Sequence, residues 1–224
     1  MKRYKLYTYF RSSAAYRVRI ALNLKALPYE AVPVHLLRNG GEQLVEPYSA
    51  VNPSKLLPAL EVDVNAGEGE GAAIHQSLAI LEYLEETQPL VPLLPKDALG
   101  RARVRALALT IACDIHPLTN LRVLKHLQAT LGISDEAKQE WYRHWVREGL
   151  AMLEAHLARD PQTGRFCHGD TPTLADCCLV PQVFNALRFN VSLAPYPTVE
   201  RIHAACAELP AFLAAHPSQQ PDAE

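Results

Sequence analysis

Two adjacent serines, Ser12 and Ser13, lie between a predicted strand, Lys5 to Phe10, and a predicted helix, Tyr16 to Ala26. A helix N-terminus presents free backbone N–H groups and the positive end of the helix dipole, so it favours an anion, including a thiolate. An unperturbed thiol has a pKa of about 8.5, which such a position lowers toward neutrality. A serine hydroxyl that donates to the sulfur stabilises the charged form further. The serine pair therefore predicts a thiolate site.

The same serines also have a purely structural interpretation, because serine is a leading residue at helix N-caps. The position of the cysteines adds a constraint to the thiolate hypothesis. All five cysteines lie at or beyond Cys113, so the part of the chain before it supplies no thiol. A thiolate at Ser12 and Ser13 would therefore have to belong to a bound small molecule.

Two further segments of the thiol-free part suit a peptide-like ligand. Leu57-Pro58 follows an Asn52-Pro53 turn and precedes a predicted strand. If the Leu57-Pro58 bond is cis, Leu57 turns its backbone polar groups toward solvent or toward a ligand, and the sequence allows either isomer. Ser77 begins a helix whose N-terminus can bind a carboxylate. Together with the serine pair, these segments predict a pocket for a small acidic peptide thiol.

The elements around these residues predict one small mixed sheet covered by helices. The predicted order is β-α-β followed by β-β-α, with a loop at Asn39-Gly40-Gly41 that has room for a short helix. The predicted strands are Lys5–Phe10, Glu30–Leu36, Ala59–Val64 and Ala72–His75, the last two forming a hairpin across a Gly-Glu-Gly-Glu-Gly turn, and the predicted helices are Tyr16–Ala26 and Ser77–Thr87.

Three prolines then mark a linker, because they interrupt any regular pattern between residues 88 and 97. Beyond them the periodicity is helical. We therefore predict an α+β domain at 1–87, a linker at 88–97 and an all-helical domain at 98–224. The helices predicted in the last domain are Arg101–Cys113, Asp135–Leu157, Leu174–Phe189 and Thr198–Ala207.

The helix Leu174–Phe189 is apolar on nearly every side, which indicates a buried central helix. Thr173 and Asp176 have the spacing of a capping box, so we interpret them as fold residues rather than catalytic ones. The polar tail, 217–224, is predicted to fray.

Composition excludes several other classes. The formal net charge of −2 and a pI near 6.5 give no long-range attraction to nucleic acid or an anionic membrane. No stretch reaches the roughly 20 apolar residues of a membrane helix, and the N-terminus lacks a signal-peptide core. An odd number of cysteines without a CxxC pair indicates reduced thiols and a cytoplasmic location. Metal-ligand spacings, GxSxG, GxGxxG and Walker loops are absent from the sequence, so no metal is expected.

The run Arg11-Ser12-Ser13-Ala14-Ala15-Tyr16-Arg17-Val18-Arg19-Ile20-Ala21-Leu22 closely resembles the signature of zeta-class glutathione transferases, a family that includes maleylacetoacetate and maleylpyruvate isomerases. The resemblance covers essentially the whole chain. It continues through Asn52-Pro53, Leu57-Pro58, His75-Gln76-Ser77-Leu78-Ala79-Ile80, Cys113-Asp114-Ile115-His116-Pro117, Gly169-Asp170-Thr171, Leu179-Val180-Pro181-Gln182-Val183 and Gln220-Pro221-Asp222.

This resemblance implies a thioredoxin-like N-terminal domain, an all-helical C-terminal domain and a homodimer, which together form the glutathione transferase architecture. It also implies glutathione as the cofactor. The residues that match the family's glutathione site are Ser12, Ser13, Gln43, Leu57 (backbone), Gln76 and Ser77, with His116 and Asn120 from the helical domain.

Three arginines, Arg11, Arg122 and Arg188, match family positions associated with the acid groups of a small dicarboxylate substrate, for which the two-pronged guanidinium is suited. Each of these arginines also has an explanation that involves no substrate. Arg11 lies in a loop, and Arg188 lies near a helix C-terminus, where the dipole alone favours a cation. On a helical wheel His116 and Asn120 share a face, whereas Arg122 points about 120° away from His116. Pro117 is expected to distort the helix there, so the wheel does not decide the role of Arg122.

The reaction implied by the resemblance is a glutathione-dependent cis–trans isomerisation, with Ser12, Ser13 and Arg11 as catalytic residues. Ala14 stands where the family often has cysteine, and activity is expected to survive because the reacting thiol belongs to glutathione. We favour maleylacetoacetate, and thus tyrosine and phenylalanine catabolism. The alternatives are maleylpyruvate isomerisation, transfer chemistry on small haloacids, and a binding module without chemistry.

Overall fold

The computed structural model describes residues 4–62 and 72–224. The chain divides into two compact units, Met1–Leu93 with Leu209–Glu224, and Leu94–Glu208. The predicted domains, 1–87 and 98–224, differ from this division at the C-terminal end. Residues 209–224 were assigned to the helical domain on their helical pattern, yet in the structure they belong to the unit that contains the sheet.

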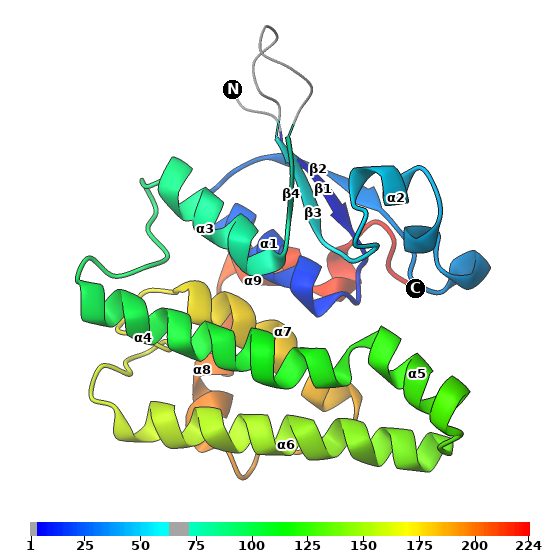
Figure 1. Cartoon of the computed structure of the whole chain (residues 1–224). Coiled ribbons are helices and arrows are strands. Elements are labelled where there is room, and N and C mark those ends of the chain that lie inside the picture. Colours follow the sequence, from blue (N-terminus) through cyan, green and yellow to red (C-terminus); the bar gives the residue numbers. More distant parts are fainter. Residues whose placement is uncertain (1–3, 63–71) are drawn as a thin grey trace, which may run out of the picture. The chain divides into compact units, whose positions relative to one another are not determined.

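The first unit contains a four-stranded mixed sheet in the order β2-β1-β3-β4 (Figure 1). β1 pairs with β2 in parallel and with β3 antiparallel, and β3 pairs with β4 antiparallel. The predicted mixed sheet is therefore confirmed. Its strands are β1 (Tyr4–Thr8), β2 (Tyr29–Pro33), β3 (Ala59–Val62) and β4 (Ala72–His75), and the predicted Gly-Glu-Gly-Glu-Gly turn lies outside the described residues.

Helices of the first unit follow the predicted order with small shifts at their ends. The helix α1 packs against α3 and against α9, and Figure 1 shows the red C-terminal segment beside the blue α1. A short α2 places Tyr48 in a core with Val34 and Ala59. The helices are α1 (Ser13–Leu24), α2 (Tyr48–Val51), α3 (Ser77–Thr87) and α9 (Pro210–Ala215), with 3-10 turns η1 (Arg38–Gly40), η2 (Glu42–Leu44) and η5 (Pro217–Gln219).

The tail is ordered by specific hydrogen bonds, so the prediction that residues 217–224 fray was wrong. Gln220 is 7% exposed, and its side-chain amide donates to the carbonyls of Ala214 and His216, at 3.0 Å each. The Asp222 carboxylate accepts the Phe10 N–H at 3.0 Å. Polar composition hid this order, because the tail is held by polar bonds rather than by apolar burial.

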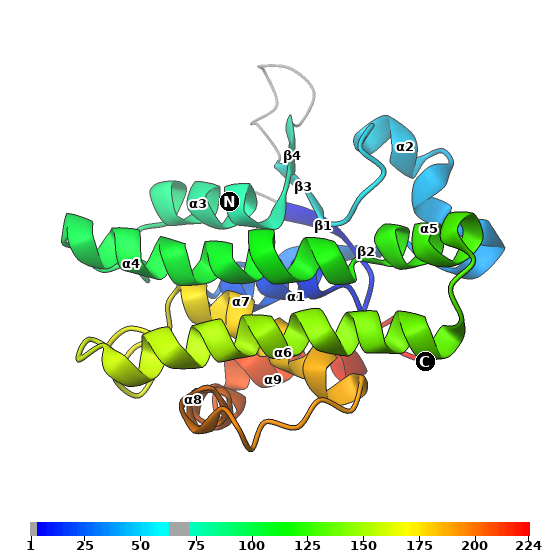
Figure 2. The same cartoon turned by 60° about the horizontal axis from the view of Figure 1, so that its bottom comes forward.

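The second unit is helical, as predicted. Its central helix α7 is buried along most of its length, packs against α4 and α8 (Figure 2), and begins with the predicted Thr173–Asp176 capping box. The elements are α4 (Ala98–Leu109), a π-helical segment η3 (Thr110–Ile115), a 3-10 turn η4 (His116–Thr119), α5 (Leu121–Leu131), α6 (Asp135–Arg159), α7 (Leu174–Arg188) and α8 (Pro197–Ala207).

The helix α5 was not among the predicted elements, and it changes how three candidate residues are arranged. Asn120 has extended backbone angles (φ −67°, ψ 144°) and caps α5 by accepting the Arg122 N–H at 3.1 Å. A helical wheel therefore does not describe His116, Asn120 and Arg122, because a single wheel needs one continuous helix. Pro117, in the 3-10 turn before this break, explains why the regular helix does not continue.

In the part of the chain that the structure describes, no helix is long and apolar enough to cross a membrane. Over the same residues, no three His, Cys, Asp or Glu side chains gather as metal ligands would.

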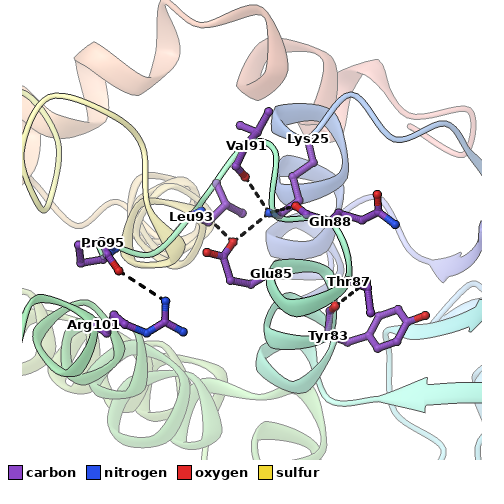
Figure 3. A network of polar contacts seen from close by, with 9 residues as sticks. All are labelled: Lys25, Tyr83, Glu85, Thr87, Gln88, Val91, Leu93, Pro95 and Arg101. Carbon is purple, nitrogen blue, oxygen red and sulfur yellow. Dashed lines mark hydrogen bonds and ion pairs between the residues drawn. The ribbon is translucent and has the colours of Figure 1, made fainter. Parts of the chain in front are cut away.

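A buried ion pair joins the C-terminal ends of α1 and α3 (Figure 3). The Lys25 ammonium lies 2.9 Å from the Glu85 carboxylate, and the two side chains are 1% and 7% exposed. The ammonium also donates to the carbonyls of Gln88 and Val91, while Glu85 accepts the Leu93 N–H at 2.8 Å. The pair thus fixes the start of the segment that follows α3.

Glu85→Ala is expected to lower the free energy of unfolding by about 3–5 kcal/mol, because it leaves the Lys25 charge buried without its partner. Urea unfolding followed by circular dichroism measures this change. The exposed neighbour provides a control, Glu86→Ala, which should change the free energy by no more than about 0.5 kcal/mol.

Replacing both partners, with Lys25→Met and Glu85→Leu, should recover part of the loss, since an apolar pair leaves no uncompensated charge, while the Leu93 N–H still lacks its acceptor. An unfolding free energy of Glu85→Ala equal to that of wild type would contradict the assigned role of the pair.

Candidate functional site in the N-terminal unit and candidate residues of the helical unit

The start of α1 has a hydroxyl hydrogen available for an acceptor. Ser12 is the N-cap, with extended backbone angles (φ −69°, ψ 110°), and its Oγ accepts the Ala15 N–H at 3.2 Å. Because accepting this bond uses a lone pair only, the Ser12 O–H can still donate. Ser13, the first helical residue, is 6% exposed. The structural and functional interpretations of Ser12 are therefore compatible, since one hydroxyl both caps the helix and can bind an anion.

Arg11 adds a cation next to this helix start. Its side chain is half-buried, and the guanidinium carbon lies 4.7 Å from the centre of the Phe10 ring. A guanidinium over an aromatic face is held by attraction to the ring while its N–H groups remain able to donate.

The segment before β3 presents the backbone of Leu57. The Leu57-Pro58 bond is cis. The preceding Leu56 carbonyl accepts from the Asn52 side-chain amide at 2.7 Å and from the Tyr48 hydroxyl. Neither backbone polar group of Leu57 has a hydrogen-bond partner within residues 4–62 and 72–224. The turn therefore holds Leu57 in place and leaves its N–H and carbonyl for an extended peptide ligand.

The start of α3 offers a second set of first-turn N–H groups. Gln76 occupies the N-cap with φ 69° and ψ 120°, backbone angles that residues other than glycine rarely adopt. No side-chain hydrogen bond caps the helix there. Such local strain concentrates at ligand sites. Ser77 is 5% exposed and accepts from the Arg17 guanidinium at 3.1 Å. The buried cation and the helix dipole both favour a carboxylate at this terminus.

Gln43 supplies a buried amide with an unpaired oxygen. It lies in η2, it is 8% exposed, and its Oε1 has no hydrogen-bond partner among the described residues. Gly41 makes room for this amide, because a Cβ there would come within 2.7 Å of both amide atoms, and its φ of +123° favours glycine independently. An orphaned acceptor of this kind indicates a ligand or water donor.

Four candidate residues belong to the second unit. His116 is half-buried in η4, Asn120 uses its side-chain oxygen to cap α5, and Arg122 is exposed. Arg188 is exposed at the end of α7, and its guanidinium carbon lies 4.9 Å from the centre of the Phe189 ring.

The Arg188 side chain rests on a rigid aromatic support. The Phe189 ring stacks on the buried Tyr142 ring with centroids 3.6 Å apart and planes inclined by 14°. Burial raises the pKa of the Tyr142 phenol to about 12, and the charge of Arg188 opposes that rise. Arg143 donates to the Phe189 carbonyl at 3.0 Å. Arg188 therefore presents a cation that is held by packing while remaining exposed.

No thiol of this chain competes for the helix start within the first unit, since all five cysteines lie in the second. Cys113 is exposed and the other four are buried. Burial raises the pKa of Cys167 and of Cys206 well above the usual range, which keeps both thiols neutral. The fit to the predicted cofactor is therefore good. The first unit offers donors at the N-termini of α1 and α3, an amide oxygen of Gln43 without a donor, and the backbone polar groups of Leu57. An acidic peptide thiol has groups that can pair with each of these.

Arg17 was missed by the sequence reasoning, although it donates to one of the predicted residues. It is 2% exposed and donates to Ser77 Oγ. The available signal was a pair of basic residues, Arg17 and Arg19, in an otherwise apolar stretch of helix, which is typical of internal ion or ligand contacts.

Comparison with known proteins supports the same kind of site. Residues 11–87 match the profile of the glutathione S-transferase N-terminal domain, and residues 135–218 match that of the C-terminal domain. A probable maleylacetoacetate isomerase of Vibrio cholerae is 51% identical over 218 residues, which cover 97% of each chain.

Two solved structures are similar over nearly their full length. A holo maleylpyruvate isomerase, described as a bacterial zeta-class glutathione S-transferase, has a TM-score of 0.90 at 49% identity and covers 98% of this chain and 100% of its own. A maleylacetoacetate isomerase of Methylobacterium extorquens AM1, with bound malonate and glutathione, has a TM-score of 0.90 at 43% identity and covers 98% and 99%.

Proposed function

Because the chain belongs to the glutathione S-transferase family, we propose that it is a zeta-class glutathione-dependent isomerase that converts maleylacetoacetate to fumarylacetoacetate. The observation that carries the proposal is the start of α1, where Ser12 caps the helix and keeps a hydroxyl hydrogen to donate, in a unit without a thiol of its own. The proposed domains are 1–87 for glutathione and 98–224 for substrate, joined by 88–97, with residues 209–224 belonging to the compact unit of the first domain.

When bound, glutathione supplies the nucleophilic thiolate of a cis–trans isomerisation and is regenerated in each cycle. Ser12 would donate its hydroxyl hydrogen to the sulfur, and the N–H groups at Ser13 and beyond would favour the negative charge. The backbone of Leu57 would hold the peptide part. Gln76 and Ser77, supported by Arg17, would hold a carboxylate. The side chains of Gln43, His116 and Asn120 complete the proposed cofactor set.

Three arginines are proposed to hold the acid groups of the substrate, namely Arg11, Arg122 and Arg188. A guanidinium can bind a carboxylate through two parallel hydrogen bonds, which fixes orientation as well as charge. Arg11 and Arg188 are both supported by an aromatic face. Such support restricts the guanidinium before substrate arrives, so little entropy is lost on binding.

Ser12→Ala is expected to reduce turnover at pH 7 about tenfold, since losing the hydrogen bond to the thiolate should raise the thiol pKa by about one unit. Turnover should recover as the pH rises, because the glutathione thiol then ionises even without a hydrogen bond from Ser12. Measuring kcat between pH 6 and 9 tests this expectation.

The helix cap needs a separate control in that experiment. Ser12→Ala should also cost about 1 kcal/mol of stability, whereas Ser12→Gly keeps most of the cap stability without a side-chain donor and Ser12→Thr keeps both cap and hydroxyl. If Ser12→Gly showed the wild-type pH profile, the hydroxyl would not be the group that stabilises the thiolate.

Arg188→Lys is expected to raise KM for the dicarboxylate roughly tenfold or more, because an ammonium cannot form the two parallel bonds of a guanidinium. Steady-state kinetics with varied substrate and saturating glutathione measures the change. KM for glutathione should stay at the wild-type value, and an equal rise in both KM values would contradict a substrate-specific role.

The experiment that tests the proposed function is turnover of maleylacetoacetate and of maleylpyruvate by purified protein, each with and without glutathione. We expect isomerisation of maleylacetoacetate that requires glutathione and does not consume it. Faster isomerisation of maleylpyruvate would favour the second candidate, which the 49% identity to a maleylpyruvate isomerase supports. Consumption of glutathione with a haloacid, and no isomerisation, would overturn both.

A homodimer and a cytoplasmic location are part of the same proposal. The dimer is supported by the family resemblance, which implies a homodimer. The support for the location is the set of free cysteines among the described residues.

A further inference from the structure

The peptide groups just before Ser12 are held from two directions. The Phe10 N–H donates to the Asp222 carboxylate at 3.0 Å, and the Phe10 carbonyl accepts from the Arg19 guanidinium at 3.1 Å. The Tyr9 carbonyl accepts the Ser12 N–H at 2.9 Å and lies 3.4 Å from Arg19. The turn that places Ser12 at the start of α1 is thus fixed by a side chain of α1 and a side chain of the tail.

Arg19 holds its side of the turn from inside the first unit. Its side chain is fully buried, and it also donates to Thr8 Oγ1 at 3.0 Å and to the Ala215 carbonyl at 3.1 Å. Burial lowers the pKa of Arg19 to about 10, while charge interactions with Tyr29, Tyr16 and Asp222 oppose that fall. A buried cation needs such a complete set of acceptors to be tolerated.

The tail holds Asp222 from both sides. Before it, Gln220 is bonded to the carbonyls of Ala214 and His216. After it, Glu224 pairs with Arg38 and lies 3.5 Å from the Nε2 of His35. The Asp222 carboxylate is therefore placed before any ligand arrives.

The tail's carboxylate is only partly satisfied. The second oxygen of Asp222, Oδ1, is buried and has no hydrogen-bond partner within the described part of the chain. A buried acceptor without a donor lowers stability. The hydrogen bond that this carboxylate does accept comes from the Phe10 N–H, so the Phe10 peptide is the group that it fixes.

We propose that Asp222 is a positioning residue for the thiol site, which acts through the Phe10 peptide on the direction of the Ser12 hydroxyl and the first N–H groups of α1. The proposal rests on the proposed function, since it names a residue that supports the same site. Misplacement of a reacting group by about 1 Å can cost two orders of magnitude in rate. A tail bond that fixes the turn is therefore able to affect catalysis without touching the ligand.

The test compares Asp222→Ala, Asp222→Asn and wild type by two measurements that do not depend on turnover. The first is the pKa of the thiol of bound glutathione, followed by thiolate absorbance as the pH is varied. The second is hydrogen exchange at the amides of residues 10–15 in protein without glutathione. Ser218→Ala is the matched control, because it removes a tail contact with His216 that involves neither Asp222 nor the turn.

We expect Asp222→Ala to raise the pKa of the bound thiol by about half a unit or more and to speed exchange at residues 10–15 at least tenfold. Asp222→Asn keeps an acceptor oxygen and should lie between Asp222→Ala and wild type. The control should match wild type in both measurements. Unchanged thiol pKa and exchange in a folded Asp222→Ala protein would overturn the proposal, as would equal changes in the control.

These outcomes separate the inference from the proposed function. If wild type lowers the thiol pKa and Asp222→Ala does so equally, the positioning role fails and the thiol site stands. If wild type does not lower it, both the thiol site and the positioning role fail. Accelerated exchange without any change in the thiol pKa would show a merely structural tail contact, which also overturns the positioning role.

Discussion

The start of α1 is the constraint on which the rest of the site depends. A helix N-terminus stabilises a thiolate only if its first N–H groups and its cap stay aligned with the sulfur, since the effect of the dipole falls off within one turn. Ser12 meets two requirements at once, because its oxygen accepts the Ala15 N–H while its hydrogen remains to be donated. The supply of a thiol from outside the first unit follows from the sequence, in which no cysteine precedes Cys113.

Buried arginines connect this helix start to the remaining parts of the first unit. Arg17 and Arg19 lie two residues apart on α1 and are 2% and 0% exposed. Arg17 reaches Ser77 at the start of α3, and Arg19 reaches the turn before Ser12 and the carbonyl of Ala215. Two basic residues of one helix, separated by Val18, thus support the carboxylate end and the thiol end of the proposed cofactor site.

Sequence reasoning succeeded where local patterns decide the structure. The mixed sheet, the bounds of α3 and the capping box at Thr173 follow from apolar periodicity and from side chains that bond their own neighbours. It failed where distant polar bonds decide. The tail is ordered by Gln220 and Asp222, whose partners no local pattern reveals. The Leu57-Pro58 isomer and the break at Asn120 likewise depend on packing around the segment.

Prediction of the site shows the same division. Ser12, Ser13 and Ser77 were proposed from the sequence because a serine at a helix start has a local physical meaning. Arg17 was missed because its role is visible only once α1 and α3 are packed together. The three substrate arginines were proposed from family resemblance, and the structure adds the aromatic supports of Arg11 and Arg188, which the sequence alone does not predict.

The most direct test of the central claim is a pH titration of the thiol of glutathione bound to the wild-type protein, followed by thiolate absorbance. The account predicts a midpoint at least one unit below the value of about 8.5 for an unperturbed thiol, measured as the difference in absorbance between protein with and without glutathione. A midpoint equal to that of free glutathione, in protein shown to bind it, would contradict the claim that the start of α1 activates the thiol.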